Sequence, residues 1–454
     1  IEDEELLWKY HLHYFDYLNQ RDTQFNAEME FLVLSWIKKN DFKKKIAWDS
    51  YPTSLRVVNW IKWIINNQVN NEEINENLFQ QGRYLLKRIE YYLTGNHLLA
   101  NAKALIFLGC FFKSTYGEEF LKKGLNLLEK ELNNQILDDG GHYEKSLMYQ
   151  SIVIEDLLDI YSISMEFPNF FNQIFLKEKI LQMSKFLVQL THSNGEKSYF
   201  NDCSEYSSLS FEDLDFYSKS LGIKLHSSDN GVNFLPHSEF ISCRNESSNL
   251  LINYGSIGPD NLMAHAHANS LSFEFSLDNQ KIFVNSGVSS YQNLGQRNKE
   301  RGTASHNTLE IDRRNSSDVW SSFRCGKRAK TKIICNLSNK SSLNFKALHD
   351  GYSSFLNKKI HIRNFKYDFN SLEIKDSVIG LFFEAISRIH LHPDVIYKEK
   401  KILLDSGKII SFKYENCELN VIDSEWSRGF GDIVKSKTLE FRLLSKNSNI
   451  KFTW

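Results

Sequence analysis

The 454-residue sequence has little proline, little cysteine and almost no net charge. Its 5 prolines and 21 glycines exclude a collagen-like or low-complexity chain. The 55 basic and 56 acidic side chains give a net charge of −1, whereas a dedicated nucleic-acid-binding domain is normally strongly basic. Polar residues interrupt every apolar run before the ~18 residues that a membrane helix needs. The sequence therefore predicts a soluble globular protein with neither a nucleic-acid partner nor a membrane segment.

The 6 cysteines form no CxxC pair and no tight cluster. This spacing argues against a thiolate zinc site and against a framework of disulfides. The sequence starts without a charged-then-apolar leader, so its first residues indicate no compartment. What the chain has in abundance is aromatic residues, 13% of the total with 33 Phe and 20 Tyr, enough to fill a large core.

Up to about Gly222 the apolar residues recur with a helical period. Over residues 76–93 they fall three, four or seven positions apart, as one face of an amphipathic helix requires. The residues that form this stripe are Leu78, Leu85, Leu86, Ile89 and Leu93. Similar stripes occupy residues 120–132 and 152–160. Short polar breaks separate them, which favours antiparallel helix pairs.

After about Asn230 the period changes to two. Residues 272–277 alternate, Asp278-Asn279 follows as a hairpin turn, and residues 281–284 form the return strand. The alternation continues at 309–311, 360–362 and 372–374. Strands that follow helices indicate separate layers or domains. We therefore predict a helical domain over residues 1–225 and an antiparallel β-sandwich domain over residues 226–454.

Two polar segments of the helical half are candidates for chemistry. Asn96-His97 follows a Thr-Gly turn, where Asn96 is either a helix N-cap or, with His97, part of an anion site with a proton shuttle. The loop at 139–150 brings a Gly-Gly pair, several polar groups and Tyr149 to the start of a helix. Tyr149 is either a core aromatic or a general acid or base.

Two further segments lie in the β half. On an extended chain residues 265, 267 and 269 point to one side, so His265 and His267 have the spacing of metal ligands, with Asn285 and His306 as further candidates. Residues 297–328 are rich in arginine, which indicates either a solvated face or a site for a carboxylate-bearing polymer. These arginines are Arg297, Arg301, Arg313, Arg314, Arg324 and Arg328.

Together these segments resemble the heparinase II/III-type polysaccharide lyase superfamily, which includes alginate lyases, and in particular its subset associated with bacterial surface-polysaccharide genes. The resemblance covers nearly the whole chain and is carried by residues 8–17, 51–60, 96–97, 139–149, 265–269, 301–308 and 319–324. It implies an incomplete (α/α) toroid of helical hairpins followed by an antiparallel β-sandwich. It also implies β-elimination at a uronic acid of an anionic polysaccharide, and a bacterial periplasmic or cell-surface location.

The resemblance assigns roles residue by residue. Asn96 and His265 would bind and neutralise the uronate carboxylate, while His97 and Tyr149 would act as base and acid, in an order set by the stereochemistry of the substrate. Neutralising that carboxylate is the main requirement, because C5–H is very weakly acidic. The predicted substrate-binding residues are Tyr291, Arg297, Arg301, Arg324, Asp202 and Glu144.

The metal site of the family, usually zinc, maps onto His267, Asn285 and His306. Asn285 and Asn269 stand where Asp is common in the family, and an amide is a poor zinc ligand. Ser289 stands where many relatives have an aromatic residue. The substitutions therefore weigh against zinc more than against catalysis.

Two alternatives to a lyase use the same residues differently. One is a catalytically silent glycan-binding protein of capsule or O-antigen assembly, which Asn269, Asn285 and Ser289 favour. The other is a glycoside hydrolase that reuses the fold and needs a carboxyl pair, for which Glu144 and Asp202 are the candidates.

Overall fold

Helices occupy the first half of the chain and strands the second in the computed structural model, which describes residues 4–20, 26–43, 45–260, 262–354 and 357–454. The chain forms two compact units. The helical unit comprises Ile1–Ile136 and Val153–Ile180, and the strand unit comprises Leu137–Ile152 and Leu181–Trp454.

The helices described before the first strand range in length from a single turn to 21 residues. They are α1 (Leu6–His11), η1 (Asp16–Asn19), α2 (Asn26–Lys39), α3 (Lys45–Trp48), α4 (Ser50–Asn67), α5 (Glu72–Leu86), α6 (Gly95–Phe111), α7 (Thr115–Gln135), α8 (Leu147–Glu166), η3 (Pro168–Phe170), α9 (Gln173–Leu190) and α10 (Phe211–Ser220).

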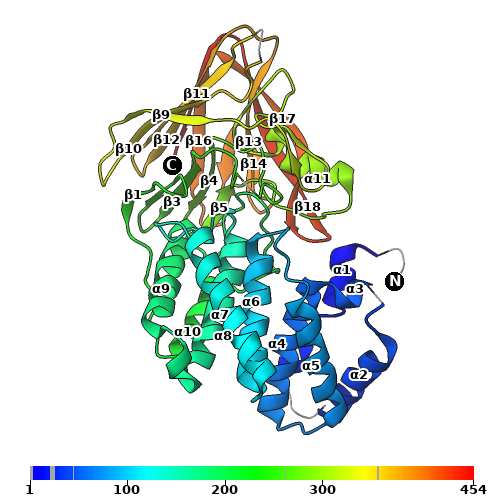
Figure 1. The fold of residues 1–454 in the computed structure, drawn as a ribbon. Coiled ribbons are helices and arrows are strands. Elements are labelled where there is room, and N and C mark those ends of the chain that lie inside the picture. The colour runs from blue at the N-terminus through cyan, green and yellow to red at the C-terminus, as the bar shows by residue number, and fades with distance from the viewer. Residues whose placement is uncertain (1–3, 21–25, 44, 261, 355–356) are drawn as a thin grey trace. The chain divides into compact units, whose positions relative to one another are not determined.

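Helix α6 lies at the centre of the helical unit and packs against α4 and α7 (Figure 1). It is buried on nearly all sides because most of its residues are apolar. Gly109 permits the close approach of α7, since a Cβ atom there would lie 2.5 Å from the Cβ atom of Leu121. No helix in the described part of the chain combines the length and apolar character that crossing a bilayer requires.

The helix expected over residues 76–93 is shorter than predicted. Helix α5 ends at Leu86, and residues 91–93 form a turn. The side chain of Asn101 accepts a hydrogen bond from the backbone N of Glu90 at 3.0 Å, which holds the chain in this turn. Ile89 still packs in the core but Leu93 is partly exposed, so the apolar spacing continued beyond the helix.

Three antiparallel sheets and a short strand pair form the strand unit. The first sheet has the order β1 (Gly231–Leu235), β2 (Phe240–Arg244), β3 (Ser248–Asn253), β4 (Ser272–Leu277) and β5 (Gln280–Phe283). The second has the order β14 (Ile396–Lys398), β15 (Lys401–Leu403), β16 (Ile409–Glu415), β19 (Asn447–Thr453), β12 (Ser371–Ile379), β11 (Ile360–Tyr367), β10 (Leu343–His349) and β9 (Thr331–Asn336). The third has the order β17 (Cys417–Gly429), β18 (Asp432–Leu443), β13 (Ala385–His390) and β6 (Leu309–Ile311). The pair is β7 (Val319–Trp320) with β8 (Arg324–Cys325), and the helical turns of this part are α11 (Leu294–Arg301) and η4 (Thr303–Ser305).

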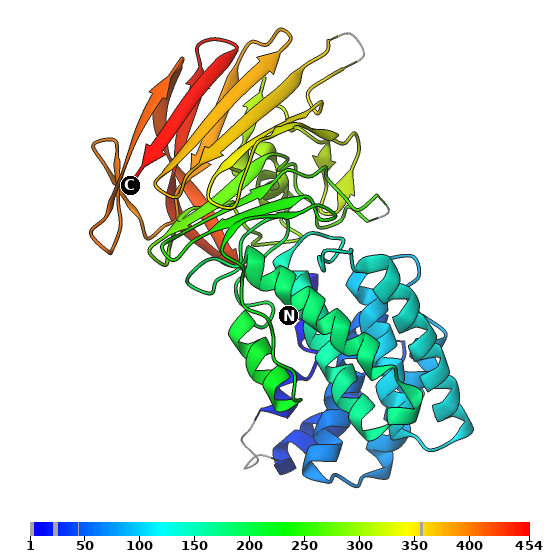
Figure 2. The ribbon, with the colours of Figure 1, turned by 90° about the vertical axis from the view of Figure 1, so that its left-hand side faces the viewer.

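The sheets of the strand unit stack in layers around one apolar core, which contains side chains from all three (Figure 2). Phe273 of β4 contacts Phe365 of β11 with ring centroids 5.8 Å apart, and Phe283 contacts Phe452 of β19 at 4.8 Å. The predicted hairpin is confirmed, because β4 and β5 pair antiparallel. Asp278 and Asn279 between them have positive φ, as the tight turn requires.

The segment before β4 is not the extended strand that the sequence predicts. Residues 264–265 form a turn, and β4 begins only at Ser272. The backbone here pairs with two separate segments, since Asp202 N donates to His265 O at 3.0 Å and Ala268 N donates to Arg301 O at 2.9 Å. The segment therefore delivers its side chains to different partners.

Candidate active site

The candidate site lies in the strand unit and begins with the loop that precedes Tyr149. Asp139 anchors this loop by accepting a hydrogen bond from the backbone N of Ser238 at 2.7 Å. Gly140 has a φ of +87°, and a Cβ atom there would lie 2.2 Å from Gln182 O, so no other residue fits this turn. The loop ends at Leu147, where α8 begins, and it places Tyr149 in the first turn of the helix.

Four side chains from three distant segments form one hydrogen-bonded chain. The Tyr149 hydroxyl lies 3.0 Å from His265 Nε2 and 2.9 Å from the Tyr291 hydroxyl. On its other side, His265 Nδ1 is hydrogen-bonded to Glu144 Oε2. The rings of Tyr149 and His265 stack with centroids 4.2 Å apart. The chain thus runs Tyr291–Tyr149–His265–Glu144.

The direction of these hydrogen bonds follows from the carboxylate. An ionised carboxylate only accepts, so His265 carries its proton on Nδ1 and its Nε2 accepts from the Tyr149 hydroxyl. Burial, and to a smaller extent the neighbouring Tyr291, hold the pKa of Tyr149 well above its ordinary value. Tyr149 therefore keeps its proton at neutral pH. Of the four side chains, Tyr149 and Glu144 are buried, whereas His265 and Tyr291 are partly exposed.

A buried ion pair between Asp202 and Arg297 lies next to this hydrogen-bonded chain. Arg297 grips Asp202 with both Nη atoms, and His267 Nε2 lies 2.7 Å from Asp202 Oδ1. Burial alone would raise the pKa of Asp202, but Arg297 and His267 hold it well below its usual range. Arg297 also lies over the Tyr291 ring, 5.0 Å from its centroid. Asp202 and Arg297 are thus joined to each other, and Arg297 also contacts Tyr291.

The remaining predicted arginines differ in their surroundings. Arg301 is fully buried, and its guanidinium donates to backbone carbonyl oxygens, among them Ala266 O at 3.1 Å and Arg324 O at 3.1 Å. Burial, together with Arg297, lowers the pKa of Arg301 to about 10. The side chain of Arg324 is exposed, while Arg313 pairs with Glu384 at the surface. Arg301 therefore braces the loops around the site.

Asn96 and His97 belong to the helical unit, in the first turn of α6. The N-cap of this helix is Thr94, so Asn96 is not the cap that the sequence allowed. Its amide instead donates to the Tyr51 hydroxyl at 3.4 Å. His97 stacks on the Tyr51 ring with centroids 4.3 Å apart, and its Nδ1 lies 3.3 Å from Glu90 Oε1. Within the helical unit, Tyr51 thus orients both predicted residues.

The three predicted metal ligands do not offer the donors of a zinc site. His267 and His306 lie close, with ring centroids 5.2 Å apart, but the Asn285 amide oxygen accepts from His306 Nδ1 and from Asn307 N, both at 3.2 Å. Asp202 is already committed to Arg297 and His267. No cluster of three or more ligating side chains with metal geometry occurs among the described residues. The two imidazoles alone fall short of the usual tetrahedral set.

Glu274, which no sequence motif indicated, organises this region. The alternation of β4 places it between Phe273 and Phe275 on a face expected to be polar, yet it is fully buried. Its carboxylate accepts from Tyr199 N and Asn285 N at 3.0 and 2.8 Å, and it lies 2.8 Å from His192 Nε2. Ser289 stands where many relatives have an aromatic residue. Its backbone N donates to the buried carboxylate of Glu300 at 3.1 Å. No local pattern distinguishes such carboxylates from solvated ones.

Comparison with known proteins identifies the fold. A crystal structure of heparinase III superposes with a TM-score of 0.79 at 15% identity, covering 98% of this chain and 75% of that one. A mutant heparan sulfate lyase from Pedobacter heparinus gives a TM-score of 0.72 at 16% identity, covering 99% and 77%. The expected fold class is confirmed: an incomplete (α/α) toroid of helical hairpins is followed by an antiparallel β-sandwich.

The family follows from the sequence itself. Residues 2–220 match the family model "Heparinase II/III N-terminus", and residues 228–454 match "Heparinase II/III-like, C-terminal". The chain belongs to the heparinase II/III family. It is 23% identical over 377 residues to the heparin-sulfate lyase of Bacteroides stercoris, which covers 69% of this chain and 55% of that protein. The chain thus spans about half the length of this curated relative.

Proposed function

We propose that the protein is a polysaccharide lyase that cleaves a uronate-containing polysaccharide by β-elimination. The observation that carries the proposal is the position of the Tyr149 hydroxyl. It lies within hydrogen-bond distance of His265 Nε2 and the Tyr291 hydroxyl, and His265 is held by Glu144. A phenol that is protonated, oriented and linked to two exchangeable partners has the properties of a general acid.

In the proposed reaction a base removes the proton on C5, and that electron pair becomes the C4–C5 double bond. The bond between C4 and the glycosidic oxygen breaks, and the leaving oxygen takes the proton of Tyr149. The phenolate left behind accepts a hydrogen bond from Tyr291, which limits the energy of the buried charge. The base then returns its proton to Tyr149 through solvent, so the enzyme is regenerated.

The other catalytic roles are proposed from the resemblance to the family. Asn96 and His265 bind the substrate carboxylate, for which His265 carries a second proton on Nε2 in the complex with substrate, and His97 takes the C5 proton. Hydrogen bonds to that carboxylate stabilise the enolate-like state, which is the main energetic requirement of the reaction. Arg297 and Arg301 act on this chemistry by positioning, because internal partners occupy their guanidinium groups.

Two observations favour a lyase over a glycoside hydrolase. A hydrolase needs one carboxyl group to donate a proton and another to act as base or nucleophile. Asp202 is fully buried and gripped by Arg297, which keeps it ionised and unable to act as an acid. Glu144 is 1% exposed and bound to His265 Nδ1. Both carboxylates therefore bind basic side chains of the protein, which leaves neither one available as the acid or base of a hydrolase.

The substrate class is proposed from the chemistry and from the relatives. The name of the Bacteroides stercoris relative, a heparin-sulfate lyase, supports a polymer in which uronic acid alternates with an amino sugar. Surface polysaccharides of bacteria that contain uronic acid belong to the same chemical class. An anionic polysaccharide is thus the proposed partner.

The proposal is tested by incubating the protein with a panel of uronate polysaccharides that includes heparan sulfate, alginate and bacterial capsules. Elimination creates an unsaturated uronate, whose ultraviolet absorbance reports the reaction directly. We expect absorbance to rise with at least one polymer and to stay flat with its carboxyl-reduced form. Binding without any rise in absorbance across the panel would instead support the silent glycan-binding protein.

A further inference from the structure

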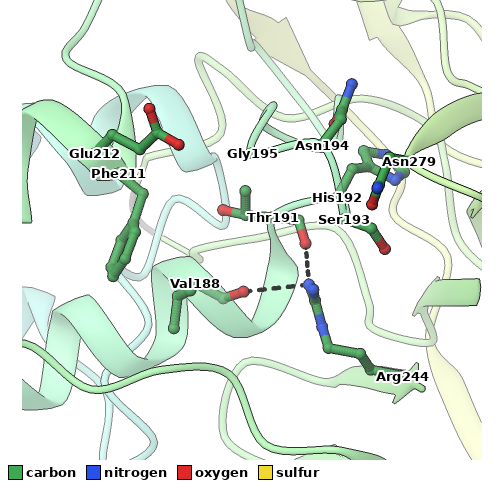
Figure 3. A pocket seen from close by; sticks show the side chains of 10 residues that line it. All are labelled: Val188, Thr191, His192, Ser193, Asn194, Gly195, Phe211, Glu212, Arg244 and Asn279. Atoms are coloured by element: carbon green, nitrogen blue, oxygen red, sulfur yellow. Dashed lines mark hydrogen bonds between the residues drawn. The ribbon is translucent and has the colours of Figure 1, made fainter. Parts of the chain in front are cut away.

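A hollow of about 470 Å³ lies in the strand unit where α9 ends, apart from the residues of the candidate active site. Its walls come from residues 191–195, the start of α10, Arg244 and the β4–β5 turn (Figure 3). Tyr149, His265 and Tyr291 do not line it. The volume falls within the range of ligand sites in proteins. The hollow therefore has room for a ligand of its own.

Arg244 is a cation in this hollow without an anionic partner among the described residues. Its Nη2 donates to the carbonyl oxygens of Val188 and Thr191, at the C-terminal end of α9 (Figure 3). Its Nε is buried and has no hydrogen-bond partner in the described part of the chain. Burial lowers the pKa of Arg244 to about 10, and no carboxylate offsets that effect. The free N–H of such a guanidinium suits an anion, because hydrogen bonds between charged groups are strong.

Two more buried polar atoms of the hollow are unsatisfied. His192 is 1% exposed, and its Nε2 lies 2.8 Å from Glu274 Oε2, so Nε2 donates and Nδ1 is left as an acceptor. Neither His192 Nδ1 nor Ser193 Oγ has a hydrogen-bond partner within the described residues. Buried polar atoms are nearly always paired, with protein, water or ligand. The hollow thus combines a cation, Arg244, with a hydrogen-bond acceptor, His192 Nδ1, and a hydroxyl group, Ser193 Oγ. Each has an atom without a hydrogen-bond partner among the described residues.

The opposite wall has different chemistry. Phe211 and Glu212 lie across the hollow from Arg244 (Figure 3). An aromatic ring suits the apolar face of a sugar, and a carboxylate accepts hydrogen bonds from sugar hydroxyls. A simple anion such as phosphate would gain only from Arg244 and would be repelled by Glu212. A ligand with one acid group and several hydroxyls matches both walls.

We propose that this hollow is a second carbohydrate-binding site, which takes one acidic sugar unit of the polysaccharide. The sugar carboxylate pairs with Arg244, and its hydroxyls bind His192 Nδ1, Ser193 Oγ and Glu212. Its ring lies against Phe211. The choice of a uronate as ligand rests on the proposed function, while the polar atoms that recognise it do not.

A neighbouring hollow refines the class of ligand. It has a volume of about 240 Å³ and shares the lining residues Asn194 and Asn279 with the first, so the two are adjacent. Its lining has four carboxylates, Glu196, Asp278, Asp394 and Asp405, and one lysine, Lys281, which pairs with Glu196. It therefore disfavours a second acidic unit. A chain in which acidic and uncharged sugars alternate fits the pair of hollows better than a densely sulfated one.

The test counts binding sites by calorimetry, with an unsulfated glucuronate–hexosamine tetrasaccharide as the probe. The protein carries Tyr149→Phe, which we expect to slow turnover by at least about 10²-fold. We expect two sites, and Arg244→Gln should weaken one of them by about 10–100-fold, the effect of losing a hydrogen bond to a charged group. Arg313→Gln, which removes an exposed arginine elsewhere, should leave both sites. The carboxyl-reduced tetrasaccharide should not bind at the Arg244 site.

Since Arg244 also binds the end of α9, its removal could affect folding. Ser193→Ala is therefore measured in parallel with the thermal unfolding of each variant, and it should weaken the same site by about 3–10-fold. A single site in the starting protein, or two unchanged sites in both variants, would overturn the proposal. If the protein eliminates a polymer but calorimetry finds one binding site, the second site is refuted and the proposed lyase activity is not. If binding depends on Arg244 but no polymer is eliminated, the second site is supported and the proposed lyase activity is refuted.

Discussion

Replacing Glu144 by glutamine tests how the structure orients Tyr149, the proposed general acid. The carboxylate of Glu144 keeps the proton of His265 on Nδ1, so that Nε2 accepts the Tyr149 O–H at 3.0 Å. A glutamine amide can donate to Nδ1 and so move the proton to Nε2, which then faces the Tyr149 oxygen as a donor. The hydroxyl loses its acceptor and its orientation, although the shape of the site is kept.

The size of the effect follows from this geometry. Glu144 is 1% exposed, so water does not replace the lost carboxylate. Where a buried carboxylate fixes the tautomer of a catalytic histidine in other enzymes, its amide lowers kcat by about 10⁴-fold. General acid catalysis contributes about 10²–10⁴-fold, which sets the range expected for Glu144→Gln. This range corresponds to about 3–5 kcal/mol of transition-state stabilisation.

The assay is the initial rate of absorbance increase on the best polymer of the panel, with KM and kcat separated. We expect kcat to fall and KM to change little. Glu425→Gln is the matched control, because it removes a carboxylate from an exposed ion pair with Lys299. A Glu144→Gln enzyme with kcat within about 3-fold of the original, and an unaltered thermal transition, would refute the tautomer argument.

The remaining predictions concern stability. Asp202→Asn breaks a fully buried ion pair with Arg297 and should lower the free energy of unfolding by about 3–5 kcal/mol in urea titrations, whereas an unchanged midpoint would contradict the account. Burial lowers the pKa of His142 to about 4 and that of His390 to about 3, so below pH ~6.5 the unfolded chain binds protons that the folded chain does not. The free energy of unfolding should therefore decrease as the pH is lowered. We expect a loss of about 2 kcal/mol for each of these histidines between pH 7 and pH 5, as measured by unfolding at each pH. A flat profile over that interval would show that these imidazoles are not buried in the neutral form.

Local patterns predicted the elements of the fold that depend on neighbours in sequence. The β4–β5 hairpin was predictable because alternation and the Asp278-Asn279 turn lie within a dozen residues. The end of α5 was not, since the turn after it is fixed by a hydrogen bond from Glu90 N to the distant Asn101 side chain. The burial of Glu274 was not predictable for the same reason. All the side chains of β4 are buried, and the groups that satisfy Glu274 come from other segments.

The candidate site was predictable as a set of residues and not as an arrangement. Tyr149 and His265 were found through motifs shared with a family, and the structure brings them to 3.0 Å. The pairing of Asp202 with Arg297 spans 95 positions, and no spacing rule connects them. The sequence therefore offered Asp202 and Glu144 as a carboxyl pair, whereas each one holds a different basic side chain.

The central claim is that the Tyr149 hydroxyl donates the proton that releases the leaving sugar, and Tyr149→Phe tests it most directly. This variant keeps the ring that stacks on His265 and removes only the hydroxyl. Tyr254→Phe, in the apolar core of the strand unit, is the matched control. On the polymer that the original protein cleaves, we predict that Tyr149→Phe loses at least about 10²-fold of the ultraviolet-detected rate while still binding the polymer, and that Tyr254→Phe keeps its rate. A Tyr149→Phe enzyme that eliminates at the original rate would contradict the account.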